Sequence, residues 1–465
     1  MTSWTLGASA NMGVVQVSDN RPSWSKETKR LLQLAGPLIV NNLSISGMQF
    51  VDAVMSGRIS AETLAAVAVG GSVWLFAFTI GLGLMMAISP IAARLYGAAE
   101  ADQIGAYTRQ GIYLGIALAV PIMIAAHTIV EPLLVLIGID TGFRDLTVGY
   151  TKAVTWGAPG IFTFLALRYT TEGIGITKPI MYTSLFALAC NACLNYVLMF
   201  GHFGFPAMGA IGCGYASAIT MWLIAIILIV YMLSQKTYRQ MGIFASFAPP
   251  PFRVLKEIVS LGLPIAVTIT AEVGLFNAVA ILMGTRGAEI TAAHQIAINF
   301  AATMFMVPLA LSSAITVRVG HELGAGRLQS ARFAGALGIA VCAVFMTCSA
   351  LILLVWRDAV VSLYTNDPVV QGIAISLLLM AAIFQIADGM QIGAAGALRG
   401  YKDTAVPMVI NTFAFWVLAF PLAFLAAVTY KLPPNYIWGG FVIGLGAAAI
   451  LLTWRYALVS KRYSG

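Results

Sequence analysis

Long apolar runs recur along the chain, and short polar joints separate them. A helix needs about 20 apolar residues to cross roughly 30 Å of hydrocarbon. The first half predicts six such helices, at residues 31–56, 63–91, 108–131, 146–170, 178–201 and 207–234. The second half predicts six more, at residues 257–284, 291–317, 330–356, 367–398, 405–429 and 436–459. The pattern indicates an all-α polytopic membrane protein with twelve transmembrane helices.

The longest interior joint divides the chain into two halves. Residues 235–256 contain Lys, Arg and three consecutive prolines, a composition typical of a linker. We interpret residues 31–234 as an N-lobe of six helices and residues 257–465 as a C-lobe of six helices with a short C-terminal end. Residues 1–30 lack the charged-then-apolar order of a signal peptide, and we expect them to form a mostly disordered tail.

The two halves are copies of one unit. A shift of 227 residues places Pro37 on Pro264, Gly57 on Gly284 and Gly97 on Gly324. Because each copy has an even number of helices, both enter the membrane in the same orientation. Parallel repeats of this kind place a substrate site at the interface between the halves, near the bilayer midplane. The duplication therefore favours a transporter, although by itself it also fits a mere record of gene duplication.

Composition and charge support a membrane location. The chain is 60% hydrophobic and only 9% charged, whereas soluble domains carry roughly 25% charged residues. Twenty of the 26 Lys and Arg residues lie in the two terminal segments, the central linker and the joints on the same side. This bias predicts that both termini and the linker are cytoplasmic. The net charge of +8 is thus a topology signal and a contact for anionic lipid rather than for nucleic acid.

Enzymatic, redox and metal chemistry find little support in the sequence. No HExxH, GxSxG or Walker pattern occurs, and the four histidines are scattered. All five cysteines lie inside apolar runs, including the CxxC of Cys190 and Cys193, which we interpret as small buried apolar residues. We therefore expect no enzyme, no cofactor and no ATP-driven pump.

Three acids lie inside predicted transmembrane helices: Asp52, Glu272 and Asp388. A charge at the bilayer centre costs at least about 2.5–3.5 kcal/mol. No Lys or Arg lies within one helical turn of any of them along the chain. An unpaired buried carboxylate takes up a proton or holds a cation, which is the chemistry of an antiporter. The alternative is a satisfied acid that faces a small water-filled pocket.

Asn191 and Asn195 are four residues apart and share one face of a predicted helix. Their amide oxygens could complete a cation site with Asp52, although such a pair also serves to hold helices together. The repeat places neither Asp52 nor Glu272 on an acid. The two lobes are therefore chemically different.

Proline, methionine and phenylalanine supply further candidates. Pro37 and Pro264 each remove a helix hydrogen bond and permit bending. Methionine and aromatic side chains could line an adaptable apolar cavity, although most of them simply face lipid or the core. The candidates for that cavity are Met48, Phe276, Met283, Met304 and Phe305.

Four segments together carry a resemblance to a known family. They are PLIVNN…QFVDAVMSG within residues 37–57, AAHQIAIN at 292–299, MVPLALSSAITVRVGHELGAG at 306–326 and ADGMQIGAAGALRGYKDTAVP at 387–407. On these segments the chain resembles the multidrug and toxic compound extrusion (MATE) transporters, and among them the NorM-like branch. The resemblance covers residues 31–460.

The resemblance implies a V-shaped pair of six-helix lobes in a bacterial-type inner membrane. It implies an antiporter that exchanges cationic or amphipathic drugs for H⁺ or Na⁺. Asp52, Asn191 and Asn195 match the N-lobe cation site of the family. Glu272 and Asp388 match the C-lobe cation site of the NorM-like branch. We expect the protein to be a monomer, with drugs or toxic organic cations and membrane lipid as its partners.

Two details of the resemblance concern mechanism. In some relatives the helix bends at the proline that matches Pro37 when the acid is protonated, which implies a hinge here. Phe384 lies one turn before Asp388, where some sodium-linked relatives carry tyrosine, and this difference slightly favours protons. A flippase for lipid-linked precursors, as in the wider superfamily, is the alternative function. Such proteins typically have additional helices and a cationic central cavity. The acids in this chain instead indicate a cationic substrate.

Overall fold

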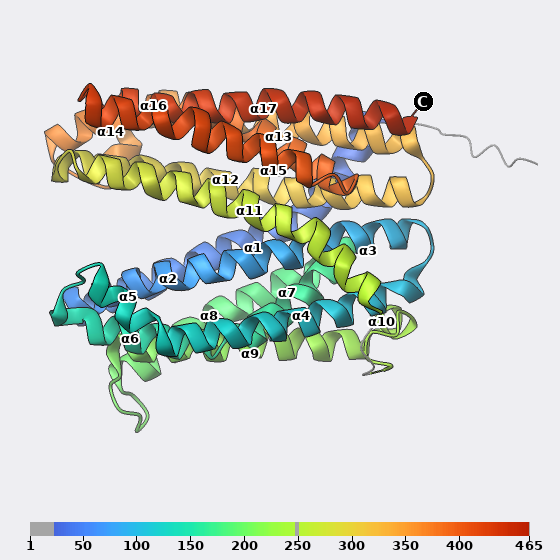
Figure 1. Cartoon of the computed structure of the whole chain (residues 1–465), viewed down its shortest axis with the longest axis horizontal. Coiled ribbons are helices and arrows are strands. Elements are labelled where there is room, and N and C mark those ends of the chain that lie inside the picture. The colour runs from blue at the N-terminus through green and yellow to red at the C-terminus, as the bar shows by residue number, and fades with distance from the viewer. Residues whose placement is uncertain (1–22, 247–250, 465) are drawn as a thin grey trace, which may run out of the picture.

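The computed structural model describes residues 23–246 and 251–464. Within these ranges the chain is helical and contains no strand. Figure 1 shows two layers of long helices that run along the same axis, with most of the first half of the chain in one layer and most of the second half in the other. The first helix of each half, blue and yellow-green, crosses from one layer to the other and packs against it. The structure confirms the prediction of an all-α protein with two lobes.

The N-lobe is formed by the helices that precede the central linker. They are α1 (Trp24–Ile59), α2 (Ala61–Met86), α3 (Ile88–Gly97), α4 (Ala101–Thr128), α5 (Val130–Leu136), α6 (Thr141–Thr155), α7 (Ala158–Gly173), α8 (Lys178–Phe200) and α9 (Gly209–Ser234). A short helix in the linker, α10 (Lys236–Gln240), follows them.

The C-lobe is formed by the remaining helices. They are α11 (Phe252–Gly284), α12 (Ala288–Gly324), α13 (Leu328–Ser362), α14 (Pro368–Gly400), α15 (Ala405–Phe413), η1 (Ala414–Ala419), α16 (Phe420–Phe424), η2 (Leu425–Thr429) and α17 (Pro434–Ser464). The segments η1 and η2 are π-helical turns on either side of α16, where Pro421 lacks the N–H that a regular helix needs.

Eleven helices of the described residues are long and apolar enough to cross a membrane. The predicted continuous helix 146–170 is absent from this set because it is broken into α6 and α7. Pro159 lies in the first turn of α7 and cannot donate a backbone hydrogen bond. The indole N–H of Trp222 donates to the carbonyl of Trp156 at the break, at 3.0 Å. Together α6 and α7 provide the twelfth crossing of the described chain.

Two predicted boundaries also shift. Helix α1 begins at Trp24, because the Ser23 side chain accepts a hydrogen bond from the Lys26 amide and caps the helix. The last residues of the predicted tail 1–30 are therefore helical, and residues 1–22 lie outside the described residues. The predicted linker 235–256 contains α10, and α11 begins at Phe252.

The sequence repeat reappears as a repeat of contacts. A Cβ at Gly97 would lie 2.2 Å from the carbonyl oxygen of His321, and a Cβ at Gly324 would lie 2.0 Å from that of Arg94. The 227-residue shift that places Gly97 on Gly324 also places Arg94 on His321. The two lobes therefore meet at this end through equivalent glycines, which alone allow so close an approach.

The lobes are joined by polar contacts near the same ends of α3 and α12. The His321 imidazole Nε2 lies 2.8 Å from the carbonyl oxygen of Gly173. Farther along the interface, the Tyr107 hydroxyl of α4 donates to Glu257 of α11 at 2.5 Å. Each lobe also has its own apolar core, so the lobes are two packed bodies with a defined contact between them.

Candidate cation-binding site

The N-lobe candidate site forms where α1 crosses α8. The Asn195 amide donates to the Asp52 carboxylate at 2.5 Å and to the Asn191 side-chain oxygen at 3.2 Å. Both asparagines are 0% exposed, whereas Asp52 is partly exposed. The structure thus brings together the three residues that the sequence singles out in this lobe.

Free oxygen atoms remain at this N-lobe site. The side-chain oxygen of Asn195 is buried and accepts no hydrogen bond. The Asn191 amide donates to the Ser217 hydroxyl of α9 at 3.5 Å. This bond fixes the asparagine pair on the side opposite Asp52. A carboxylate with neighbouring amide oxygens is a ligand set that suits a hard cation, and the carboxylate alone suits a proton.

The C-lobe candidate site contains two acids from different helices. Glu272 lies on α11 and Asp388 on α14, and each carboxyl lies within the electrostatic field of the other. Asp388 is only 5% exposed, and its Oδ1 has no hydrogen-bond partner. Two carboxylates whose charges act on each other repel unless a proton or another cation is shared between them.

Two glutamines flank Asp388 and were missed by the sequence analysis. Gln385 and Gln391 lie three residues before and after it on α14, and both are buried. The Ser349 hydroxyl donates to Gln385 at 3.1 Å, and the side-chain oxygen of Gln391 has no partner. The i, i+3 spacing on one helix face is the signal that could have identified them.

None of the three acids forms an ion pair with Lys or Arg in residues 23–246 and 251–464. The same residues contain no group of three or more His, Cys, Asp or Glu that could hold a metal ion. A cation at either site would therefore be coordinated by carboxyl groups together with amide, hydroxyl or backbone oxygens.

A buried charge cluster between the lobes was also missed. It consists of Arg168 and Glu172 on α7 and Arg399 on α14. Glu172 is 1% exposed, lies 4.0 Å from Arg168 and accepts a hydrogen bond from the Ser89 hydroxyl at 3.2 Å. The Arg399 charge acts on Glu172 in one lobe and on Glu272 in the other. This arginine therefore links the C-lobe site electrostatically to the opposite lobe.

The predicted cavity residues have different surroundings. Met48, Met304 and Phe305 are partly buried. Phe276 stacks on Phe441 in the C-lobe, with ring centroids 4.7 Å apart. Met283 is 0% exposed and belongs to the C-lobe core. The structure therefore does not place Met283 on an open surface.

Pro37 lies inside α1, which continues through it without interruption. The proline has no N–H to donate to the carbonyl of Gln33, so α1 lacks one hydrogen bond between the lobe contact and Asp52. Phe384 is buried against Trp438 and Phe441 and provides no oxygen atom to the C-lobe site.

Comparisons with known proteins agree with the two-lobe arrangement. The MatE family matches residues 37–197 and again residues 264–425. The two matches begin 227 residues apart, which is the shift of the sequence repeat. Matches of both halves to one family account for more than half of the chain. The chain belongs to the MATE family.

Individual relatives cover nearly the whole MATE chain. It is 38% identical to the multidrug resistance protein MdtK of Yersinia enterocolitica over 94% of this chain and 97% of that protein. It is 36% identical to the multidrug resistance protein NorM of Aliivibrio fischeri over 93% of this chain and 95% of that protein. Its fold is similar to that of the eukaryotic MATE transporter AtDTX14, with a TM-score of 0.86, 22% identity and coverage of 95% and 98%. The chain is a NorM-like MATE transporter and not an enzyme.

Proposed function

We propose that this MATE protein is a multidrug efflux antiporter. It exchanges cationic or amphipathic drugs for H⁺ or Na⁺ as its two lobes open alternately on the two sides of the membrane. The full-length relatives named as multidrug resistance proteins support drug export as the activity. Two C-lobe acids that form no ion pair in the described residues, the partly buried Glu272 and the buried Asp388, are the observation that carries the proposed cation coupling.

The coupling follows from the cost of leaving the two carboxyls unneutralised. A cationic drug or a coupling cation shared between the two carboxyls relieves their mutual repulsion, and the site then attracts a second cation much less. Binding of one therefore weakens binding of the other, which is the requirement for exchange. Asp52 with its two asparagines provides a second cation site in the N-lobe. Arg399, which acts on both lobes, adjusts the C-lobe charge as the lobes separate.

We further propose that the protein lies in a bacterial inner membrane with both termini on the cytoplasmic side, in accordance with its distribution of Lys and Arg. The close contact of α3 with α12 then closes the cytoplasmic end of the lobe interface. We propose a monomer as the functional unit, because each chain contains both cation sites.

Transport under separately imposed gradients tests the proposal. A proton gradient or a sodium gradient is imposed across the membrane of everted vesicles that contain the protein. Uptake of ethidium into the vesicles is followed by fluorescence. We expect uptake under at least one gradient, and the buried Phe384 favours the proton gradient. Uptake that needs neither gradient would overturn the antiport mechanism. Translocation of a lipid-linked precursor without any drug transport would support the flippase alternative instead.

The matched variants are Glu272→Gln and Glu289→Gln. Both remove one negative charge, but Glu289 is an exposed residue in the first turn of α12. We expect Glu272→Gln to abolish gradient-driven uptake and Glu289→Gln to retain it. Equal loss in both variants would show that the C-lobe acid has no special role.

A further inference from the structure

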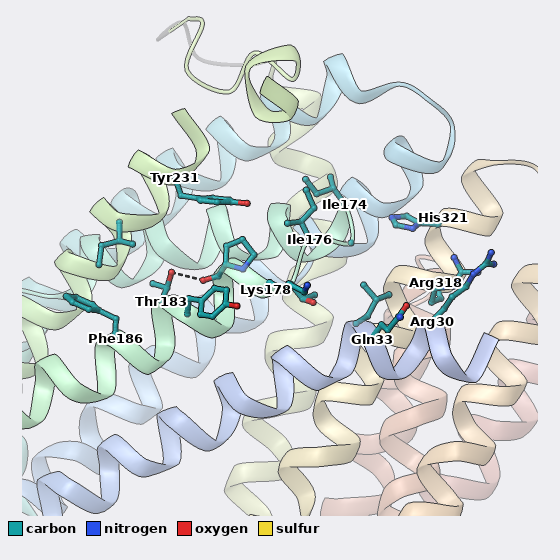
Figure 2. Close-up of a pocket in the computed structure, with 16 residues that line it drawn as sticks. Arg30, Gln33, Ile174, Ile176, Lys178, Thr183, Phe186, Tyr231, Arg318 and His321 are labelled. Atoms are coloured by element: carbon teal, nitrogen blue, oxygen red, sulfur yellow. Dashed lines mark hydrogen bonds between the residues drawn. The ribbon is translucent and has the colours of Figure 1, made fainter. Parts of the chain in front are cut away.

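A groove of about 1180 Å³ lies beside the cytoplasmic lobe contact, away from the three acids. Its walls come from α1, α8, α9 and α12 and from the joint between α7 and α8. Figure 2 shows Arg30, Arg318 and His321 at one end, Tyr231 and Phe186 at the other, and Lys178 between them. The lining contains no Asp or Glu.

The polar end of the groove is positively charged. Arg318 is committed to the acids beneath it, since it lies 2.7 Å from Glu27 and 2.7 Å from Glu322. Arg30 is 3.6 Å from the same Glu27, and its side chain is more than half exposed. Lys178 is exposed and forms no ion pair in the described parts of the chain. Arg30 and Lys178 are therefore the charges available to a ligand.

The opposite end of the groove is apolar and aromatic. Tyr182 and Phe186 follow Lys178 by one and two turns on α8, and they are 63% and 48% exposed. A rise of 1.5 Å per residue places Phe186 about 12 Å farther along the helix than Lys178. Because α8 enters the membrane from its first turn, the basic end lies near the surface and the aromatic end lies deeper.

This arrangement selects for the charge and shape of its ligand. A cationic drug is repelled by the two accessible basic groups, Arg30 and Lys178, and finds no acid in the groove lining. A small soluble anion would bind the basic end but would leave the aromatic end exposed. An anionic phospholipid satisfies both ends, since its headgroup lies at the level of Lys178 and its acyl chains lie at the level of Phe186.

We infer that the groove between α1, α8 and α12 binds an anionic phospholipid of the cytoplasmic leaflet through Arg30 and Lys178. The inference is independent of drug export, because it concerns a ligand of opposite charge at a separate place. Since α12 belongs to the C-lobe and α1 and α8 to the N-lobe, the bound lipid contacts both lobes.

Competitive lipid binding to the purified full-length protein tests this inference. The detergent-solubilised protein is titrated with phosphatidylglycerol and phosphatidylcholine of identical acyl chains, and bound lipids are counted by native mass spectrometry. Each basic group near an anionic lipid contributes about fivefold in affinity. We expect the preference for phosphatidylglycerol to fall about 25-fold in the double variant Arg30→Gln/Lys178→Gln.

The control is Lys29→Gln/Lys236→Gln, which removes the same charge from exposed residues of the same side that do not line the groove. We expect the control to keep the wild-type preference, and glycerol 3-phosphate not to displace the lipid. A wild-type protein without preference would overturn the inference, as would equal losses in both double variants. Displacement by glycerol 3-phosphate would identify a soluble anion as the ligand and would also overturn it.

Discussion

The N-lobe and the C-lobe of this transporter both contain carboxyl groups within their membrane-spanning helices, but they surround them differently. In the N-lobe one acid, Asp52, accepts a hydrogen bond from Asn195 and has Asn191 as a second neighbour. In the C-lobe two acids, Glu272 and Asp388, face each other's charge, and one oxygen of Asp388 has no donor. The N-lobe acid is partly satisfied by the protein, whereas the C-lobe pair is not.

This difference indicates which of the two sites depends more strongly on a bound cation. A hydrogen bond to a charged group contributes about 1.5–3 kcal/mol. The Asn195 amide therefore stabilises the Asp52 carboxylate and lowers its affinity for a cation. The C-lobe pair lacks this help and adds mutual repulsion. We therefore expect the C-lobe to carry most of the coupling and the N-lobe to adjust it.

The largest effect should come from Asp388→Asn. The change removes one of two mutually repelling acids, so the remaining acid loses the repulsion that makes the site bind a cation strongly, and competition between drug and cation weakens. We expect gradient-driven ethidium transport in everted vesicles to fall about 100-fold, near the upper range of coupling between two ligands. The exposed Asp358→Asn in α13 is the matched control. Retained transport in Asp388→Asn would place the coupling elsewhere.

A smaller effect should come from Asp52→Asn, because the C-lobe pair remains intact. We expect the same transport rate to fall about tenfold. Asp145→Asn, an exposed N-lobe position in α6, should leave the rate unchanged. A loss in Asp52→Asn as large as in Asp388→Asn would remove the proposed inequality of the lobes.

Removal of the amide should have a weaker effect that concerns affinity more than rate. Asn195→Ala deletes the donor to Asp52, so the carboxylate binds a cation more strongly, and we expect the cation concentration for half-maximal transport to fall about fivefold while the maximal rate is kept. The exposed Asn277→Ala on α11 serves as the control. An unchanged cation dependence would show that the asparagine only joins α1 to α8.

The smallest effect should come from Pro37→Ala. Alanine restores the hydrogen bond to Gln33 and stiffens α1, so we expect a reduction of about threefold in the transport rate. The reduction should disappear when Asp52→Asn is already present, since the bend is proposed to follow neutralisation of that acid. Pro121→Ala, inside α4, is the control for replacing any proline within a helix. An additive loss in the double variant would argue against the hinge.

The sequence predicts the fold well, because each crossing leaves a long apolar run and because the repeat is readable at a fixed shift. It does not reveal the break between α6 and α7, since Trp156 and Gly157 continue an apolar run and the break depends on Pro159 and on the contact with Trp222. The early start of α1 follows from a single capping serine, a local signal that hydrophobic periodicity ignores.

The acids of the candidate sites were identifiable because charges are rare within apolar runs. The charges of the interlobe cluster were not, because Arg168 and Arg399 lie within two turns of helix ends and resemble ordinary joint charges. Only the packing of α7 and α14 shows that both are nearly buried. Contacts between the lobes are long-range, and no local pattern encodes them.

Equilibrium binding of ethidium to the purified protein at rising H⁺ and Na⁺ concentrations tests most directly whether the C-lobe acids couple drug and cation. In the wild type, drug affinity should fall as the coupling cation is added. If that cation is the proton, affinity falls as the pH is lowered. In Glu272→Gln/Asp388→Asn most of this cation dependence should be lost, and only the smaller contribution of Asp52 should remain. An undiminished cation dependence in this variant would contradict the account.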